Sequence, residues 1–153
     1  MTHRTAYLAV VLAFACGSTT SDTTSPDLRP SPSGGGSLAG TEWILREIRG
    51  GPPIGEAEIT LVVEDSTGGG NSGCNHYGGA YAFDASTGAI VFRDMGMTAM
   101  ACAEPARNDF EMLFSQAMGQ VNTATIDPAG RLILSGPTGQ VVFVLDRQRA
   151  VEG

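Results

Sequence analysis

The sequence predicts an α+β domain in which a small, mainly antiparallel β-sheet, partly open and barrel-like, packs against one amphipathic helix. Several short segments alternate apolar and polar residues with the period of two that a half-buried strand shows, and turn residues separate them. One segment instead repeats apolar residues at intervals of three and four, the period of a helix. Strands and helices do not alternate along the chain, which argues against a parallel sheet.

The expected strands follow one another along the folded part of the chain. Their apolar positions are, in order, Trp43 and Leu45, then Ile59, Leu61 and Val63, then Ile90 and Phe92, then Leu132 and Leu134, and finally Val141, Phe143 and Leu145. Turns rich in glycine, proline, aspartate and serine are expected at residues 50–53, 86–88, 127–130 and 136–139. Residues 66–73, which contain four glycines, are expected to form a loop.

The expected helix lies between the third and fourth of these strands. Pro105 suits a first helical turn, and Asp109 and Glu111 lie near the positive end of the helix dipole. These two acids are expected on a solvated face of the helix. The apolar side chains with helical spacing, which should pack on the sheet, are Phe110, Leu113, Phe114, Ala117, Met118 and Val121.

Composition divides the chain into four parts. Residues 1–15 have a polar start and an apolar run, which as a helix would rise about 15 Å, whereas a bilayer core measures roughly 30 Å. This pattern is typical of a signal peptide. Residues 16–37 form an expected tether, since 17 of the 21 residues after Cys16 are Ser, Thr, Pro or Gly. Residues 38–147 form the expected domain, and residues 148–153 a C-terminal tail.

The junction between Ala15 and Cys16 resembles the lipobox of bacterial lipoproteins, in which the cysteine becomes the acylated first residue of the mature chain. The resemblance implies a lipid anchor at Cys16 and, because no Asp follows it, sorting to the outer membrane on its periplasmic side. Ala13 and Phe14 depart from the lipobox pattern. An unlipidated Cys16 behind an ordinary signal peptide is therefore the alternative.

The charge pattern excludes some classes of function. All nine basic residues are arginines, and sixteen acids give a net charge of −7. No cluster of cations is present to neutralise phosphates, so a nucleic-acid partner is not expected. His3 and His76 are the two histidines, which leaves little for general-base catalysis. We expect a monomer that is not an enzyme and needs no cofactor.

Three motifs mark the domain: Gly40-Thr41-Glu42-Trp43, then Gly73-Cys74-Asn75 followed by Gly79-Ala80-Tyr81, then Thr98-Ala99-Met100-Ala101-Cys102. The pair Phe110-Glu111 and a closing strand with Phe143 follow. In order and spacing, residues 38–147 resemble the META domain family, the heat-shock-inducible lipoprotein-type domains of bacterial envelopes. The resemblance implies a compact α+β domain with a small mixed sheet and one helix. It also implies an envelope role without a settled biochemical activity, and it supplies no catalytic residues.

Cys74 and Cys102 form an even pair in a chain expected to be exported. Oxidising compartments favour a disulfide between such a pair. Closing the 29-residue loop from Cys74 to Cys102 would stabilise the fold by roughly 3–4 kcal/mol.

Two other functions remain open beside a non-catalytic accessory or binding role in envelope stress or maintenance. The first is a Cu(I) site, because soft thioether and thiolate ligands select this ion; its ligands would be Met97, Met100, Cys102, Cys74 and His76. The second is an inhibitor-like domain that binds an envelope enzyme through residues 66–73 or 136–139.

Aromatic residues offer one further candidate site. Tyr77, Tyr81 and Phe83 have the even spacing of side chains on one face of a strand. The face could pack in the core, or it could be exposed and bind a protein partner, a lipid or a glycan.

Overall fold

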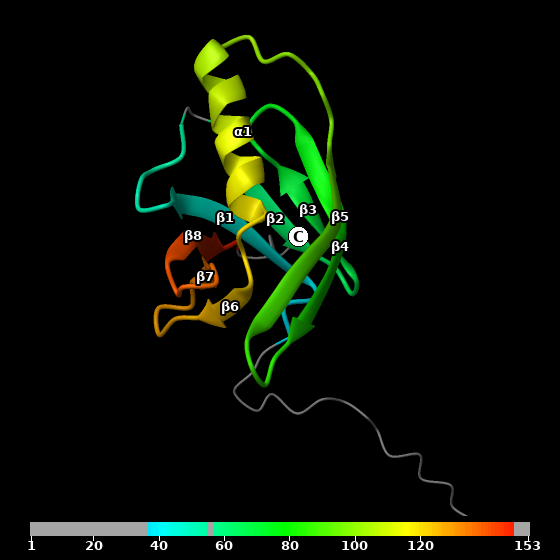
Figure 1. Cartoon of the computed structure of the whole chain (residues 1–153), viewed down its shortest axis with the longest axis vertical. Coiled ribbons are helices and arrows are strands. Elements are labelled where there is room, and N and C mark those ends of the chain that lie inside the picture. Colours follow the sequence, from blue (N-terminus) through cyan, green and yellow to red (C-terminus); the bar gives the residue numbers. More distant parts are fainter. Residues whose placement is uncertain (1–36, 55–56, 149–153) are drawn as a thin grey trace, which may run out of the picture. The chain divides into compact units, whose positions relative to one another are not determined.

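A computed structural model of the chain describes residues 37–54 and 57–148 (Figure 1). The expected signal peptide, Cys16, the expected tether as far as residue 36, and residues 149–153 lie outside this part. The described elements are, in order, β1 (Thr41–Ile48), β2 (Thr60–Val63), β3 (Thr67–Asn71), β4 (His76–Asp84), β5 (Ala89–Met97), α1 (Pro105–Met118), β6 (Thr123–Ile126), β7 (Leu132–Ser135) and β8 (Val141–Arg147).

The strands form a closed barrel in which each strand pairs with the next and β8 returns to β1. The closing pair places Leu45 opposite Leu145 and Ile48 opposite Phe143. The expected partly open sheet of an α+β domain is therefore wrong, because the structure is a β-barrel with one helix among the described residues. The mixed sheet implied by the family resemblance is also wrong, since all described strand pairs are antiparallel.

The alternation of apolar and polar residues could not predict this closure. Alternation indicates which side chains face inward, but it does not show whether the first and last strands meet. A barrel closes only when strand tilt and register agree around the whole sheet. Here closure joins residues 100 positions apart, Leu45 and Leu145.

The barrel interior confirms most of the expected inward positions. Trp43, Leu61, Leu132, Leu134 and Phe143 are each at most 2% exposed. The expected positions Leu45, Ile59, Val63, Ile90 and Leu145 are also buried, Phe92 is half-buried, and Val141 at the start of β8 is exposed.

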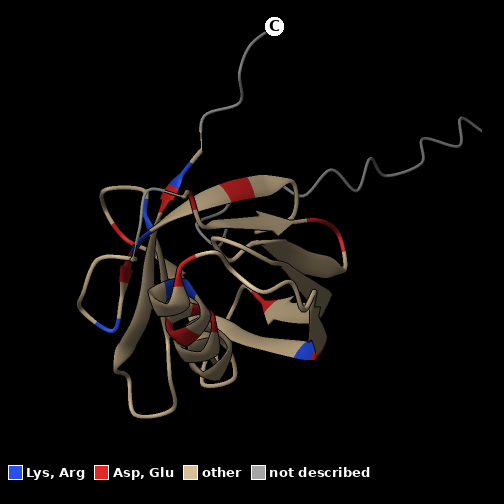
Figure 2. Ribbon diagram, turned by 90° about the horizontal axis from the view of Figure 1, so that it is seen from above, with Lys and Arg blue, Asp and Glu red and all other residues tan. Residues whose placement is uncertain are grey.

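The expected helix is confirmed as α1, which begins at Pro105 and ends at Met118. The connection from β5 passes over the top of the molecule to reach α1 (Figure 1). Figure 2 looks nearly along the axis of this helix. The ring centroid of Phe114 lies 4.8 Å from that of Tyr77 and 5.4 Å from that of Phe143. Among the described residues, no helix has the length and apolar composition needed to cross a membrane.

The prediction that residues 66–73 form a loop is wrong in part, because this segment contains β3. Glycine is disfavoured in strands, but here it is required by close backbone approach. A Cβ at Gly69 would collide with the backbone of Tyr77 and Gly78, and one at Gly70 with the carbonyl of Thr60. The glycines therefore allow β3 to fit between β2 and β4.

One seam of the barrel is much weaker than the others. β5 pairs with β4 along its length, whereas the β5–β6 ladder consists of the single pair Ala89 and Thr123. Two backbone hydrogen bonds flank this pair, from Ile90 N to Asn122 O at 3.0 Å and from Ala124 N to Gly88 O at 2.8 Å. β6 starts opposite Ala89 and runs away from the rest of β5, so the second half of β5 has no neighbouring strand on this side among the described residues.

The Phe143→Ala substitution should reduce the free energy of unfolding by about 3–5 kcal/mol, because it leaves a cavity between the barrel and Phe114. Urea denaturation followed by Trp43 fluorescence measures this loss. Val141→Ala on the same strand is the control, since Val141 is 46% exposed. Equal losses in the two variants would contradict the packing described here.

Candidate functional site

A buried carboxylate lies where α1 meets the turn between β3 and β4. Glu111 is 6% exposed. Its Oε1 accepts hydrogen bonds from Ser72 Oγ at 2.5 Å, Asn75 N at 2.6 Å and Cys74 N at 3.2 Å. Its Oε2 accepts one from Asn75 Nδ2 at 2.6 Å. The expectation that Glu111 lies on a solvated face is therefore wrong, whereas Asp109 is exposed.

Asn75 connects the same turn to the segment that precedes α1. Its Oδ1 accepts hydrogen bonds from Thr98 Oγ1 and Met100 N, both at 2.8 Å. Its Nδ2 also donates to Met100 O at 3.1 Å. Because Asn75 is 3% exposed and fully hydrogen-bonded, it holds three segments of the chain together.

Two opposing effects act on the pKa of Glu111. Burial raises the pKa. The hydrogen bonds from Ser72, Asn75 and Cys74 stabilise the charged form, and together they lower the pKa by more than burial raises it. The net result is a pKa below the ordinary value for glutamate, so Glu111 is ionised at neutral pH. Its charge is neutralised by oriented N–H and O–H dipoles rather than by a cation in direct contact.

The expected disulfide is confirmed between Cys74 and Cys102, whose Cα atoms are 5.9 Å apart. The sulfur of Cys102 lies 3.5 Å from Glu111 Oε2. Arg107 on α1 donates a hydrogen bond to Gly73 O at 3.0 Å, beside the disulfide. The disulfide, the carboxylate and the arginine thus fix the β3–β4 turn to the helix.

The other family-motif residues have structural roles. Gly40 has a φ of 72° in the turn before β1, a conformation that favours glycine. Thr41 Oγ1 accepts a hydrogen bond from Trp43 Nε1 at 2.7 Å. A Cβ at Gly79 would collide with the backbone of β5, and Tyr81 donates its hydroxyl to Glu64 O at 2.9 Å.

The residues of the expected copper site lie in different environments. Both thiols are joined in the disulfide. Met100 is 57% exposed, and His76 is exposed with its backbone N–H bonded to Thr98 Oγ1. In the described part of the chain, the His, Cys, Asp or Glu donor atoms that lie within 4.8 Å of one another belong to Cys74, Cys102 and Glu111. A thiolate ligand set would therefore require reduction of the disulfide.

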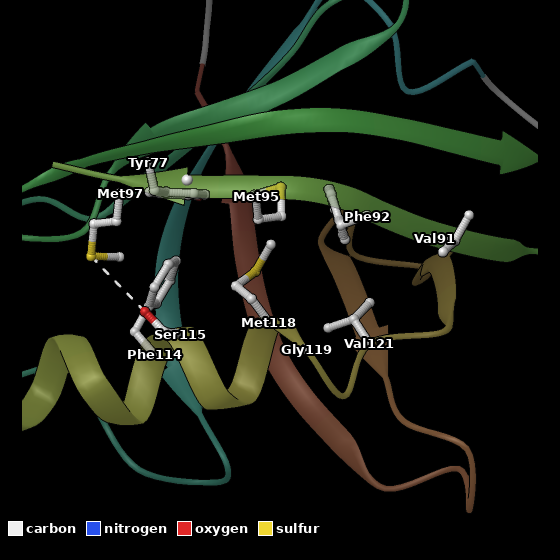
Figure 3. Close-up of a pocket in the computed structure, with 11 residues that line it drawn as sticks. Tyr77, Val91, Phe92, Met95, Met97, Phe114, Ser115, Met118, Gly119 and Val121 are labelled. Atoms are coloured by element: carbon white, nitrogen blue, oxygen red, sulfur yellow. Dashed lines mark hydrogen bonds between the residues drawn. The ribbon is translucent and has the colours of Figure 1, made fainter.

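An apolar pocket of about 360 Å³ lies between α1 and the β4–β5 hairpin (Figure 3). Three methionines, Met95, Met97 and Met118, reach into it from β5 and from the helix. Its hydroxyl groups are those of Ser115 and of Tyr77, which donates to Thr60 O at 2.7 Å. The lining residues are Tyr77, Val91, Phe92, Met95, Gly96, Met97, Phe114, Ser115, Met118, Gly119 and Val121.

The expected aromatic face is directed into the molecule. Tyr77 is 8% exposed, and Tyr81 and Phe83 are half-buried against the core. Of the two possibilities for this face, core packing is the one observed, with Tyr77 at the floor of the pocket. The pocket was not predicted from the sequence, in which the density of methionines between residues 95 and 118 is the feature that points to it.

These features define a class: a small closed antiparallel barrel, covered by one helix and closed by a disulfide beside a buried glutamate. A family model of the META domain matches residues 36–149, and the chain belongs to the META domain family. The family predicted from the three motifs is therefore confirmed.

Solved structures show the same fold. A protein from Burkholderia xenovorans, solved by NMR, is 26% identical and has a TM-score of 0.57; the match covers 72% of this chain and 83% of that one. A second protein solved by NMR is 20% identical with a TM-score of 0.50, and the match covers 68% and 86% of the two chains. The comparison with curated proteins gave no match.

The Glu111→Gln substitution should lower the free energy of unfolding at pH 7 by about 2–4 kcal/mol, because an amide cannot accept all four hydrogen bonds. The native pKa of Glu111 lies below its unfolded value, so this stabilisation is present above the unfolded pKa and is lost as pH falls through the native pKa. The difference between wild type and variant, measured by urea denaturation, should shrink below about pH 4.

The matched control is Asp109→Asn, which removes an exposed carboxylate from the same helix. It should change stability by less than about 0.5 kcal/mol. A Glu111→Gln variant as stable as this control would show that the buried carboxylate does not hold the turn to the helix.

Proposed function

We propose that this chain is a META-domain lipoprotein of the bacterial cell envelope, acylated at Cys16 and tethered by residues 17–37, with a non-catalytic accessory role in envelope stress or maintenance. It performs this role by binding, and the binding site is the apolar pocket between α1 and β5. The domain acts as a monomer on the periplasmic side of the outer membrane.

The chemistry of the pocket lining supports the proposal that the domain binds a ligand without catalysing a reaction. Its lining contains no carboxylate, imidazole, guanidinium or thiol group. Tyr77 is its one ionisable residue, and burial raises the pKa of this tyrosine well above its usual range. Its volume is near the lower end of the range for ligand pockets, about 300–1,000 Å³. Such a site favours uncharged apolar groups and offers no acid or base near neutral pH.

The environment of Glu111 also favours a structural rather than a catalytic role. A general base must be free to take up a proton, whereas this carboxylate already accepts four hydrogen bonds and has a lowered pKa. Its position beside the disulfide fits a stabilising role.

The proposed location rests on the N-terminal sequence and on the disulfide. Disulfides persist in oxidising compartments such as the periplasm and are rare in the cytosol. The Cys74–Cys102 pair is therefore consistent with export, and the lipobox-like Ala15-Cys16 junction with an anchor at the membrane.

The location can be tested by intact mass spectrometry of the chain extracted from membranes after thiol alkylation. We expect a mass consistent with acylation at Cys16 and no alkylation of Cys74 or Cys102 until the protein is reduced. Cys16→Ser should release the chain from the membrane fraction. Cleavage without lipid, or membrane retention of Cys16→Ser, would contradict the anchor, and alkylation before reduction would contradict the disulfide.

The pocket can be tested with N-phenylnaphthylamine, an uncharged apolar fluorophore, added to the full chain carrying Cys16→Ser. Ser115→Trp should weaken dye binding by about tenfold or more, because Ser115 points towards Met97 across the pocket and an indole there would fill it (Figure 3). Gln116→Trp, an exposed position on α1 outside the pocket lining, is the control and should leave binding unchanged. Absence of dye binding, or equal binding to all three proteins, would contradict the proposed site.

A further inference from the structure

The weak seam of the barrel leaves one side of β5 without a neighbouring strand. Ile90 N donates to Asn122 O, and no backbone hydrogen bond joins β5 to β6 after that point in the described residues. β5 nevertheless continues to Met97, because β4 pairs with its other side. Its second half is therefore a strand edge inside a barrel that is otherwise closed.

The hydrogen-bonding pattern identifies the backbone groups at this edge. Backbone groups of alternate residues point to opposite sides of a strand, and those of Ile90 point away from β4, so those of Phe92 do as well. The register shifts at the bulge near Asp94, which has a φ of 53°. Thr98 N donates to His76 O, so the groups of Met95 and Met97 again point away from β4.

The edge and the apolar pocket occupy the same place. Phe92, Met95 and Met97 line the pocket from β5, and Ser115 and Met118 line it from α1 (Figure 3). A group that fills the pocket therefore also covers the N–H and C=O groups of the β5 edge.

This arrangement discriminates between possible occupants. A hydrocarbon chain would fill the pocket but would remove unpaired peptide groups from water, at a cost of about 1–3 kcal/mol for each group left without a partner. An extended polypeptide avoids this cost, because its own N–H and C=O groups pair with the edge while alternate side chains enter the pocket.

The charges near the β5 edge limit which residues a bound segment can have. The pocket lining carries no charged group, so a side chain that enters it must be apolar. Arg93 and Asp94, exposed and adjacent on β5, carry opposite charges. Directly opposed residues of opposite charge stabilise neighbouring strands, so a matching acidic and basic pair complements this stretch.

We propose that the open edge of β5, between Phe92 and Met97, binds an extended segment of another polypeptide by strand addition, with an apolar side chain of the segment in the pocket. This inference rests on the proposed binding function and specifies its ligand class. The added strand pairs with the part of β5 that lies beyond the start of β6.

The experiment selects a phage-displayed library of random heptapeptides against the full chain carrying Cys16→Ser. We expect enriched peptides that place apolar residues at alternate positions. Methylating alternate backbone nitrogens of an enriched peptide should weaken binding by about tenfold or more, because the methyl groups remove donors and keep the side chains. Ser115→Trp should weaken binding similarly, and Gln116→Trp should not.

Amide hydrogen exchange supplies a readout at single residues. The N–H groups of Phe92, Met95 and Met97 should exchange rapidly in the free protein and slow down by about tenfold or more when the enriched peptide binds. This measurement and the methylated peptides need no substitution in the pocket, so the inference remains testable even if Ser115→Trp does not fold.

The possible outcomes separate the two proposals. If the dye binds in the pocket but no peptide is enriched, strand addition is overturned and the proposed binding function stands. If peptides bind regardless of backbone methylation, with no slower exchange at β5, strand addition is likewise overturned. If neither dye nor peptide binds, both proposals fail.

Discussion

The ionised carboxylate of Glu111 is the interaction on which the organisation of this domain depends. It lies on the one helix of the described structure, and four hydrogen bonds connect it to residues 36 to 39 positions earlier in the chain. A buried charge without such partners would be strongly destabilising. The helix, the β3–β4 turn and the segment before the helix must therefore adopt their positions together, and the disulfide joins the last two of these covalently.

As a result, the two halves of the helix have different chemical environments. The half near Glu111 is fixed by polar contacts and the disulfide, whereas the half near Ser115 and Met118 faces an apolar pocket lined by flexible methionines. Methionine side chains adapt to irregular apolar surfaces. The polar contacts therefore fix the position of the helix, while the side chains that line the pocket can adapt.

The sequence predicted the parts that depend on local pattern. The helix, most inward strand positions, the disulfide and the family followed from apolar periods, cysteine number and motif order. The closure between β1 and β8 and the burial of Glu111 did not, because each depends on contacts between segments far apart in the chain. The strand β3 was missed for another reason: its glycines indicate a loop unless the nearby carbonyl of Thr60 is known. The pocket lies between α1 and β5, a tertiary arrangement that periodicity cannot show.

The closing pair of the barrel has a consequence for how the chain is threaded. Trp43 in β1 lies opposite Arg147 in β8, so the domain begins and ends side by side in neighbouring strands. Around the barrel every strand follows its neighbour in the order of the sequence, and the order is therefore circular. The polypeptide could in principle start in any exposed hairpin turn, such as 127–130, and still make the same set of strand pairs. The fold is thus defined by the circular order of its strand pairs and does not depend on which strand comes first in the chain.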